Sequence, residues 1–272
     1  MSGERAARIA LRMATIAVLG FIYAPIVLVF VYSLNAGTTT VWPPVGLSFR
    51  WYLEAFQNTG LQQAFLTSIG AGIGATVIAL ILGTLASLAV SRHHFFGREA
   101  VSFAVIFPIA LPGIITGIAL SATFAQLDIP LGYPTIVIGH ATFCIVLVYN
   151  NAIARLRRTA RTYEEASADL GADSFQTFRH VTFPAVRTSL VAGALLAFAL
   201  SFDEVIVTIF TSGGVKTLPI WIFQSFRLAN QVPVVNVAGV VAILLSAIPV
   251  YIASRVAGGD LVAGPARTTA VR

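Results

Sequence analysis

Two adjacent carboxylates, Asp203 and Glu204, lie inside an apolar stretch that covers residues 188–210. An ionised side chain within a membrane costs about 2.5–3.5 kcal/mol to insert, so such residues face a polar cavity or a partner. Ser201, Glu204 and Thr208 share one face of a continuous helix, whereas adjacent residues point about 100° apart. This spacing predicts that Glu204 lines a cavity, with Asp203 at its edge or facing a partner chain. Such a stripe is suited to conducting a cationic solute; the alternative is a structural acid that pairs with an arginine or hydroxyl of a partner chain.

The connection at residues 155–187 contains two capping boxes, in which a hydroxyl or carboxylate residue is followed three positions later by Glu or Gln. They predict two short helices that meet at Gly171, and Pro184 ends the second. The connection is therefore expected to form a compact knob. The two capping boxes are Thr162 with Glu165 and Asp173 with Gln176.

The composition restricts the class of protein that these residues belong to. Of the 272 residues, 57% are hydrophobic and 10% are charged, whereas soluble domains carry about 25% charged residues. A chain this apolar cannot cover its surface with polar groups, which excludes a soluble enzyme, a nucleic-acid-binding domain and a disordered protein. The lone Cys144 excludes a disulfide within the chain and a cysteine-based metal cluster.

Six stretches are long and apolar enough to cross a membrane as helices, each of about 20 residues. They predict an all-α membrane protein with six transmembrane helices and a short helical loop between the fourth and the fifth. Prolines and glycines in the third stretch predict a kink there. The six stretches are residues 11–34, 64–91, 99–122, 134–154, 188–210 and 234–254.

The basic residues predict the orientation. Of the 17 lysines and arginines, 14 fall on the side of the amino terminus and 3 on the other. Basic residues accumulate on the cytoplasmic side, so both termini and the 155–187 loop are expected there. The predicted organisation is a cytoplasmic segment at 1–10, one transmembrane domain at 11–257 and a disordered cytoplasmic tail at 258–272.

The 155–187 loop resembles the EAA loop of importer permeases of the ATP-binding-cassette class. That pattern is Glu-Ala-Ala, three residues, Gly, nine residues and Ile-x-Leu-Pro, and the spacing here is intact. The departures are Ser167 for Ala, Val181 for Ile and Phe183 for Leu. The resemblance implies the type I importer permease fold, in which the loop docks into a groove on a cytoplasmic ATPase subunit. It places five residues at that contact: Glu165, Ala166, Gly171, Ala172 and Asp173.

Further blocks resemble spermidine/putrescine permease subunits, including Tyr23-Ala24-Pro25-Ile26, Gly139-His140-Ala141-Thr142 and Ser201-Phe202-Asp203-Glu204-Val205. This resemblance implies a bacterial inner-membrane permease for polyamines. The implied partners are a second homologous permease, two copies of an ATP-binding subunit, an extracytoplasmic solute-binding protein and membrane lipid, with no nucleic acid. The chain has one lysine, Lys216, and no phosphate-binding Gly-rich loop, so ATP and magnesium are expected on the partner subunits and no cofactor or metal on this chain.

Other classes remain as alternatives. Related permeases carry amino-acid derivatives, phosphonates or metal cations. A proton-coupled secondary transporter would use Asp203, Glu204 and His140, although no interrupted helix is evident in the sequence. An intramembrane enzyme would need a catalytic motif that the sequence lacks, so no catalytic residue is predicted. His140 is more often a hydrogen-bonding packing residue than a ligand.

Overall fold

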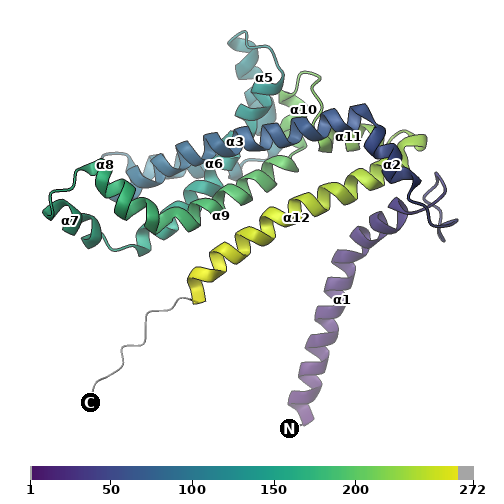
Figure 1. The fold of residues 1–272 in the computed structure, drawn as a ribbon, viewed down its shortest axis with the longest axis horizontal. Helices are drawn as coiled ribbons and strands as arrows, with labels where there is room; N and C mark the ends of the chain where they lie inside the picture. Colours follow the sequence, from purple (N-terminus) through teal and green to yellow (C-terminus); the bar gives the residue numbers. More distant parts are fainter. Residues whose placement is uncertain (1, 263–272) are drawn as a thin grey trace. The chain divides into compact units, whose positions relative to one another are not determined.

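The computed structural model describes residues 2–262, and this part of the chain is built from helices (Figure 1). Its one β contact is an isolated antiparallel bridge between Asn35 and Leu47. The helices are α1 Ser2–Ser33, α2 Arg50–Gln57, α3 Thr59–Arg92, α4 Arg98–Ala110, α5 Gly113–Gln126, α6 Tyr133–Arg158, α7 Thr162–Asp169, α8 Ser174–Thr177, α9 Phe183–Phe202, α10 Ile206–Thr211, α11 Leu218–Ser225 and α12 Val232–Val262, with a π-helical turn at Phe178–Thr182 and a 3₁₀ turn at Ala229–Gln231.

Five of these helical stretches are long and apolar enough to cross a membrane. They are Ala7–Ser33, Thr59–Arg92, Tyr133–Arg158, Ser174–Phe202 and Val232–Val256. A sixth is obtained if α4 and α5, which are bent by 108° at a short break, form one span. The predicted all-α membrane fold is therefore confirmed.

The third predicted span is broken more sharply than the expected kink. Leu111 takes an extended conformation with φ −81° and ψ 142°, and Pro112 is the N-cap of α5. The residue before a proline is disfavoured in the helical region, and the proline has no N–H to donate. The two halves are consequently separate helices, α4 and α5.

The fifth predicted span, residues 188–210, is also discontinuous. Its helix starts much earlier than expected, because the stretch from Ser174 to Phe202 is a single helical run. Pro184 does not end the preceding helix, so that prediction is wrong. A π-helical turn, in which Phe183 N donates to Phe178 O, widens the helix before this proline and lets the chain continue. The run then stops at Asp203, and α10 begins at Ile206.

The ends of the chain are more helical than predicted. α1 starts at Ser2 and so includes nearly all of the predicted cytoplasmic segment at 1–10. α12 reaches Val262, so the first part of the predicted disordered tail at 258–272 is helical. The rest of that tail, residues 263–272, lies outside the described residues.

The contacts divide the chain into two units. The first consists of Met1–Gln62 and Trp221–Ile243. Within it, the connection after α1 is ordered around Asn35 and Trp51. The buried Trp51 indole Nε1 donates to Asn35 O at 2.8 Å, while Asn35 Oδ1 accepts from Val45 N at 3.1 Å. These bonds hold the connection against α2.

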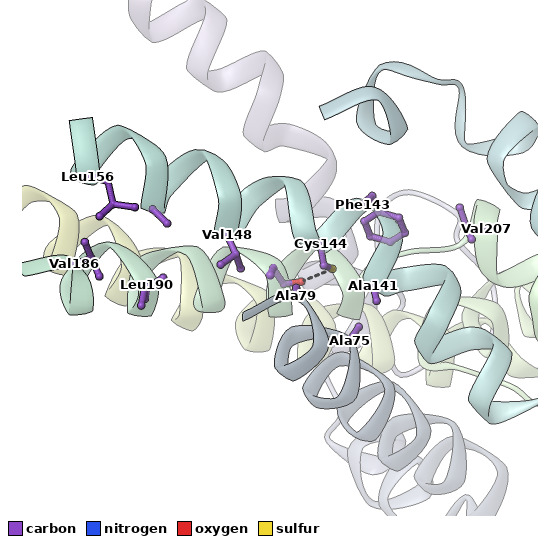
Figure 2. Packing of buried hydrophobic residues seen from close by; sticks show 12 residues of the cluster. Ala75, Ala79, Ala141, Phe143, Cys144, Val148, Leu156, Val186, Leu190 and Val207 are labelled. Atoms are coloured by element: carbon purple, nitrogen blue, oxygen red, sulfur yellow. Dashed lines mark hydrogen bonds between the residues drawn. The ribbon is translucent and has the colours of Figure 1, made fainter. Parts of the chain in front are cut away.

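The second unit, Gln63–Ile220 and Leu244–Arg272, contains the main apolar core (Figure 2). Small residues let the helices approach closely, as is typical of membrane helices. A Cβ on Gly83 of α3 would lie 3.0 Å from Ile145 O of α6, and one on Gly193 of α9 would lie 3.2 Å from Val148 Cα. Cys144 Sγ donates to Ala197 O at 3.3 Å, between α6 and α9. The core therefore ties α6 to both α3 and α9.

Candidate functional site

The knob between α6 and α9 consists of α7, a glycine turn and α8. Gly171 has φ +84°, a conformation that L side chains rarely adopt, so it ends α7 as predicted. The capping box at Asp173 is confirmed, because Asp173 Oδ1 accepts from Gln176 N at 2.8 Å and Gln176 Oε1 accepts from Asp173 N at 3.0 Å. The predicted Thr162 cap is wrong: Thr162 is already helical, and Arg161 before it makes no side-chain cap.

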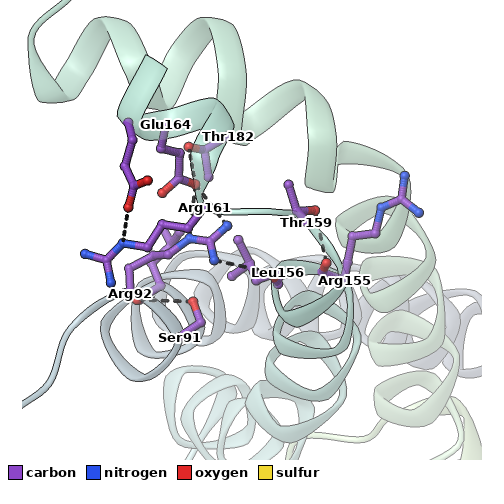
Figure 3. A network of polar contacts seen from close by, with 10 residues as sticks. Ser91, Arg92, Arg155, Leu156, Thr159, Arg161, Glu164 and Thr182 are labelled. Atoms are coloured by element: carbon purple, nitrogen blue, oxygen red, sulfur yellow. Dashed lines mark hydrogen bonds and ion pairs between the residues drawn. The ribbon is translucent and has the colours of Figure 1, made fainter. Parts of the chain in front are cut away.

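A half-buried polar network anchors the knob to the transmembrane helices (Figure 3). Glu164 Oε1 accepts from Arg92 Nε at 3.0 Å and from Thr182 Oγ1 at 3.0 Å. Arg92 Nη1 also donates to Leu156 O at 3.3 Å. Arg92 closes α3, Leu156 lies near the end of α6, and Thr182 lies in the π turn before α9. The Glu164 carboxylate thus joins α7 to α3 and to the π turn before α9, and Arg92 extends the network to α6.

Sequence reasoning selected Glu165 and missed Glu164. Glu165 is exposed and lies 3.7 Å from Arg161 Nε, one helical turn earlier. The partners of Glu164 are distant in the sequence, so no local pattern connects them. The only available signal was the pair of acidic residues in the first turn of α7.

Replacing Arg92 by Gln should loosen the knob. The change removes the charged partner of Glu164, whose side chain is only 18% exposed. Hydrogen bonds to charged groups contribute about 1.5–3 kcal/mol, so we expect R92Q to lower the free energy of unfolding by about 2 kcal/mol. Hydrogen exchange across residues 162–172 should become faster.

The matched control is R161Q, which removes the exposed 3.7 Å pair with Glu165. Exposed pairs of this kind contribute about 0–1 kcal/mol, so exchange should change little. Equal exchange in R92Q and R161Q would contradict an anchoring role for Arg92.

The predicted coupling residues form the outer surface of the knob. Glu165, Ala166, Gly171 and Asp173 are exposed, and Ala172 is half-buried. Apolar side chains lie among them: Tyr163 is 65% exposed, Leu170 89% and Phe175 67%. Large apolar groups on a connection are typical of a surface that binds another protein. This surface was predicted only in part, because the sequence reasoning did not select the three large apolar residues.

The acidic pair lies at the break of the fifth span rather than on a helical face. Asp203 caps the end of α9 and is exposed, whereas Glu204 is half-buried. Glu204 Oε1 accepts from Val207 N at 2.9 Å and so caps the start of α10. The continuous helix assumed for the polar stripe is therefore wrong.

The other two predicted pathway residues, Ser201 and Thr208, are buried against His140 of α6. His140 Nδ1 lies 2.7 Å from Ser201 Oγ, and Nε2 lies 2.8 Å from Thr208 Oγ1. Thr208 Oγ1 donates to Glu204 O, so it must accept from Nε2–H. Nδ1 contacts the Ser201 hydroxyl, so the histidine joins α6, α9 and α10.

The structure therefore brings Ser201 and Thr208 together through His140, with Asp203 and Glu204 beside them at the break. The predicted coupling residues lie elsewhere. They are separated from the break by α9, which has 20 residues and is therefore about 30 Å long. Among the described residues, no three His, Cys, Asp or Glu side chains are placed to hold a metal ion. The arrangement places an exposed, partly apolar surface at one end and a carboxylate pair at a helix break at the other.

Comparisons with known proteins agree with this architecture. The putrescine transport system permease protein PotI of Escherichia coli strain K12 is 36% identical over 217 residues, which is 76% of this chain and of that protein. The spermidine/putrescine transport system permease protein PotC of Haemophilus influenzae is 32% identical over 231 residues, covering 84% of this chain and 89% of that protein.

Solved structures show the same fold at low sequence identity. A chain of a bacterial ABC transporter involved in the import of the acidic polysaccharide alginate matches with a TM-score of 0.73 at 19% identity, covering 95% of this chain and 98% of that chain. A chain of the MetNI methionine ABC transporter matches with a TM-score of 0.59 at 17% identity, covering 78% of this chain and 99% of that chain.

The family described as "Binding-protein-dependent transport system inner membrane component" matches residues 79–258, which include α6, the knob and the broken fifth span. The chain is therefore a multi-pass membrane protein and belongs to this family, the permease subunits of ATP-binding-cassette importers.

Proposed function

We propose that this permease forms one half of the translocation pathway for a polyamine, driven by ATP hydrolysis in partner subunits. The names of the PotI and PotC relatives support a putrescine or spermidine substrate. The observation that carries the proposal within this chain is the exposed Asp203 carboxylate at the break between α9 and α10. A polyamine presents ammonium groups, which carboxylates bind through charge-assisted hydrogen bonds.

The partners follow from the family. A second homologous permease completes the pathway, two copies of an ATP-binding subunit supply the energy, and an extracytoplasmic protein delivers the solute. A related alginate importer is described in complex with a substrate-bound periplasmic protein, which supports the last of these. The distribution of 14 against 3 basic residues supports cytoplasmic termini and a cytoplasmic knob.

Coupling passes through the knob. Glu165, Ala166, Gly171, Ala172 and Asp173 contact the ATP-binding subunit, together with the exposed Leu170. Because Glu164 is bonded to Arg92 and Thr182, movement of the docked knob is transmitted to α3 and α9. Closure of the ATP-binding subunits then shifts these helices and changes access to the break at Asp203.

The test is uptake of radiolabelled putrescine and spermidine by proteoliposomes that contain the complete complex and its binding protein. We expect both polyamines to stimulate uptake and ATP hydrolysis. If ATP hydrolysis responds to another solute and not to polyamines, the chain is still an importer subunit but polyamines are not its substrate.

The discontinuous fifth span favours a second candidate function. Helices broken near the centre of a membrane line the ion sites of secondary transporters. A proton-coupled carrier of this kind would transport polyamine without ATP when a pH gradient is imposed on liposomes that contain this chain alone. Uptake that requires ATP and the partner subunits would reject it.

Neutralising Asp203 should impair uptake more than neutralising Glu204. Asp203 is exposed, whereas Glu204 already accepts a backbone hydrogen bond at the start of α10. We expect D203N to reduce polyamine uptake about tenfold, which corresponds to about 1.4 kcal/mol. E204Q keeps an oxygen that accepts from Val207 N, and should reduce uptake about threefold at most, less than 1 kcal/mol.

The comparison uses initial uptake rates at equal amounts of assembled complex. E54Q, which neutralises an exposed carboxylate of α2, serves as the matched control and should leave uptake unchanged. If D203N transports at the rate of E54Q, Asp203 has no role in the pathway.

A further inference from the structure

A polar pocket of about 460 Å³ lies where α3, α4 and α6 have their neighbouring ends. It belongs to neither the knob nor the break of the fifth span. Its polar lining comes from Arg98 and Glu99 at the start of α4, Ser102 one turn later, and Arg157 at the end of α6. Ser102 Oγ and the buried Tyr149 hydroxyl lie 2.7 Å apart, which joins α4 to α6 beneath the pocket.

The two arginines of this pocket, Arg98 and Arg157, have unpaired guanidinium groups within the described part of the chain. Neither guanidinium group makes a hydrogen bond or ion pair with any residue that the structure describes. This distinguishes them from Arg92, which is paired with Glu164. Two guanidinium groups from separate helices thus line one pocket, and Glu99 is the only acid beside them, so the lining keeps a net positive charge.

The remaining walls are apolar. Phe103 and Ile106 lie one turn apart on α4 and are 66% and 37% exposed, and the buried Val90 of α3 also lines the pocket. No residue of α4 is buried. The positive charge of the pocket therefore lies at the ends of α4 and α6. Next to it, an apolar face continues along α4.

We propose that this pocket binds the headgroup of an anionic phospholipid, phosphatidylglycerol, whose acyl chains lie along Phe103 and Ile106. Arginine forms paired hydrogen bonds with phosphate oxygens. Basic pockets between membrane helices bind anionic headgroups. The glycerol hydroxyls of the headgroup supply donors for Glu99, the one carboxylate of the pocket. The single negative charge of the lipid neutralises the net charge of the lining.

The test is native mass spectrometry of the purified, delipidated importer complex during titration with phosphatidylglycerol. A basic residue near an anionic lipid contributes about fivefold in affinity, so R98Q/R157Q should weaken binding about 25-fold. The matched control is R158Q/R179Q, which removes two exposed arginines outside the pocket. It should bind phosphatidylglycerol as the unmodified complex does.

Additional ligands identify the source of the phosphate. Phosphatidylethanolamine and phosphatidylcholine should bind more weakly than phosphatidylglycerol, and millimolar inorganic phosphate should not displace it. Displacement by inorganic phosphate, or equal binding of the three lipids, would overturn the proposal.

The melting temperature of each variant in detergent shows whether it folds. Loss of the ATP-binding subunit from R98Q/R157Q, with unchanged lipid binding, would assign the pocket to a protein contact and overturn the proposal as well. Weakened lipid binding with normal polyamine uptake would support the lipid site independently of the substrate assignment.

Discussion

Replacing Leu170 by Asp should abolish ATP-driven uptake while leaving the permease folded. Leu170 caps the end of α7 beside Gly171, and 89% of its surface is exposed. A side chain with so few contacts within its own chain contributes little to folding. The few side chains that dominate a protein interface lie near its centre, in contrast, and contribute 2 kcal/mol or more to binding, about 30-fold in affinity. A carboxylate placed in an apolar contact adds the cost of desolvation.

We therefore expect L170D to lose at least 30-fold in the affinity of the permease for the ATP-binding subunit, a difference of about 2 kcal/mol. The loss is measured by co-purification at increasing dilution and by substrate-stimulated ATP hydrolysis. V45D is the matched control, since Val45 is 78% exposed in the connection between α1 and α2. It should retain assembly and stimulation. Retention of both by L170D would show that this part of the knob lies outside the interface.

Prediction from the sequence succeeded where a single local rule decides the structure. Hydropathy alone located the long helices, because a helix satisfies its backbone hydrogen bonds within one segment and so can cross lipid. Gly171 and the capping box at Asp173 were also predicted, since a positive φ and an N-cap are properties of a few adjacent residues. The same reasoning failed at Thr162, which is the first residue of α7 rather than the residue that caps this helix.

Prediction failed where contacts between distant residues decide the structure. The helical stripe through Ser201, Glu204 and Thr208 assumed a continuous helix, but Glu204 caps a new helix. His140 lies 61 residues before Ser201 and 68 before Thr208, so its two hydrogen bonds leave no periodic signal. Ion pairing of Arg92 with Glu164 is equally non-local. The anchor of the knob and the bonds of His140 across the break depend on such contacts, whereas the cap by Glu204 is local and was missed.

His140 should be the residue whose loss most destabilises the fifth span. It is 1% exposed and bonds Ser201 of α9 and Thr208 of α10, on both sides of the break. Truncating a large buried side chain costs about 2–5 kcal/mol, and each hydrogen bond within a membrane protein contributes about 0.6–1.7 kcal/mol. We expect H140A to lower the free energy of unfolding by about 3 kcal/mol, within the range for buried truncations.

A double-mutant cycle separates the hydrogen bond from the cavity. S201A removes one bond to His140 with little change in volume, and it should cost about 1 kcal/mol. In the H140A background the same change should cost less, because its partner is already absent.

H180A is the matched control: His180 is exposed in the π turn, and Nδ1 bonds only the backbone Gln176 O. It should leave the free energy of unfolding almost unchanged. Additive effects of H140A and S201A would mean that the 2.7 Å contact does not hold α9 against α6. Strong coupling, accompanied by slower uptake in both single variants, would show that His140 keeps the break in the position from which Asp203 is presented.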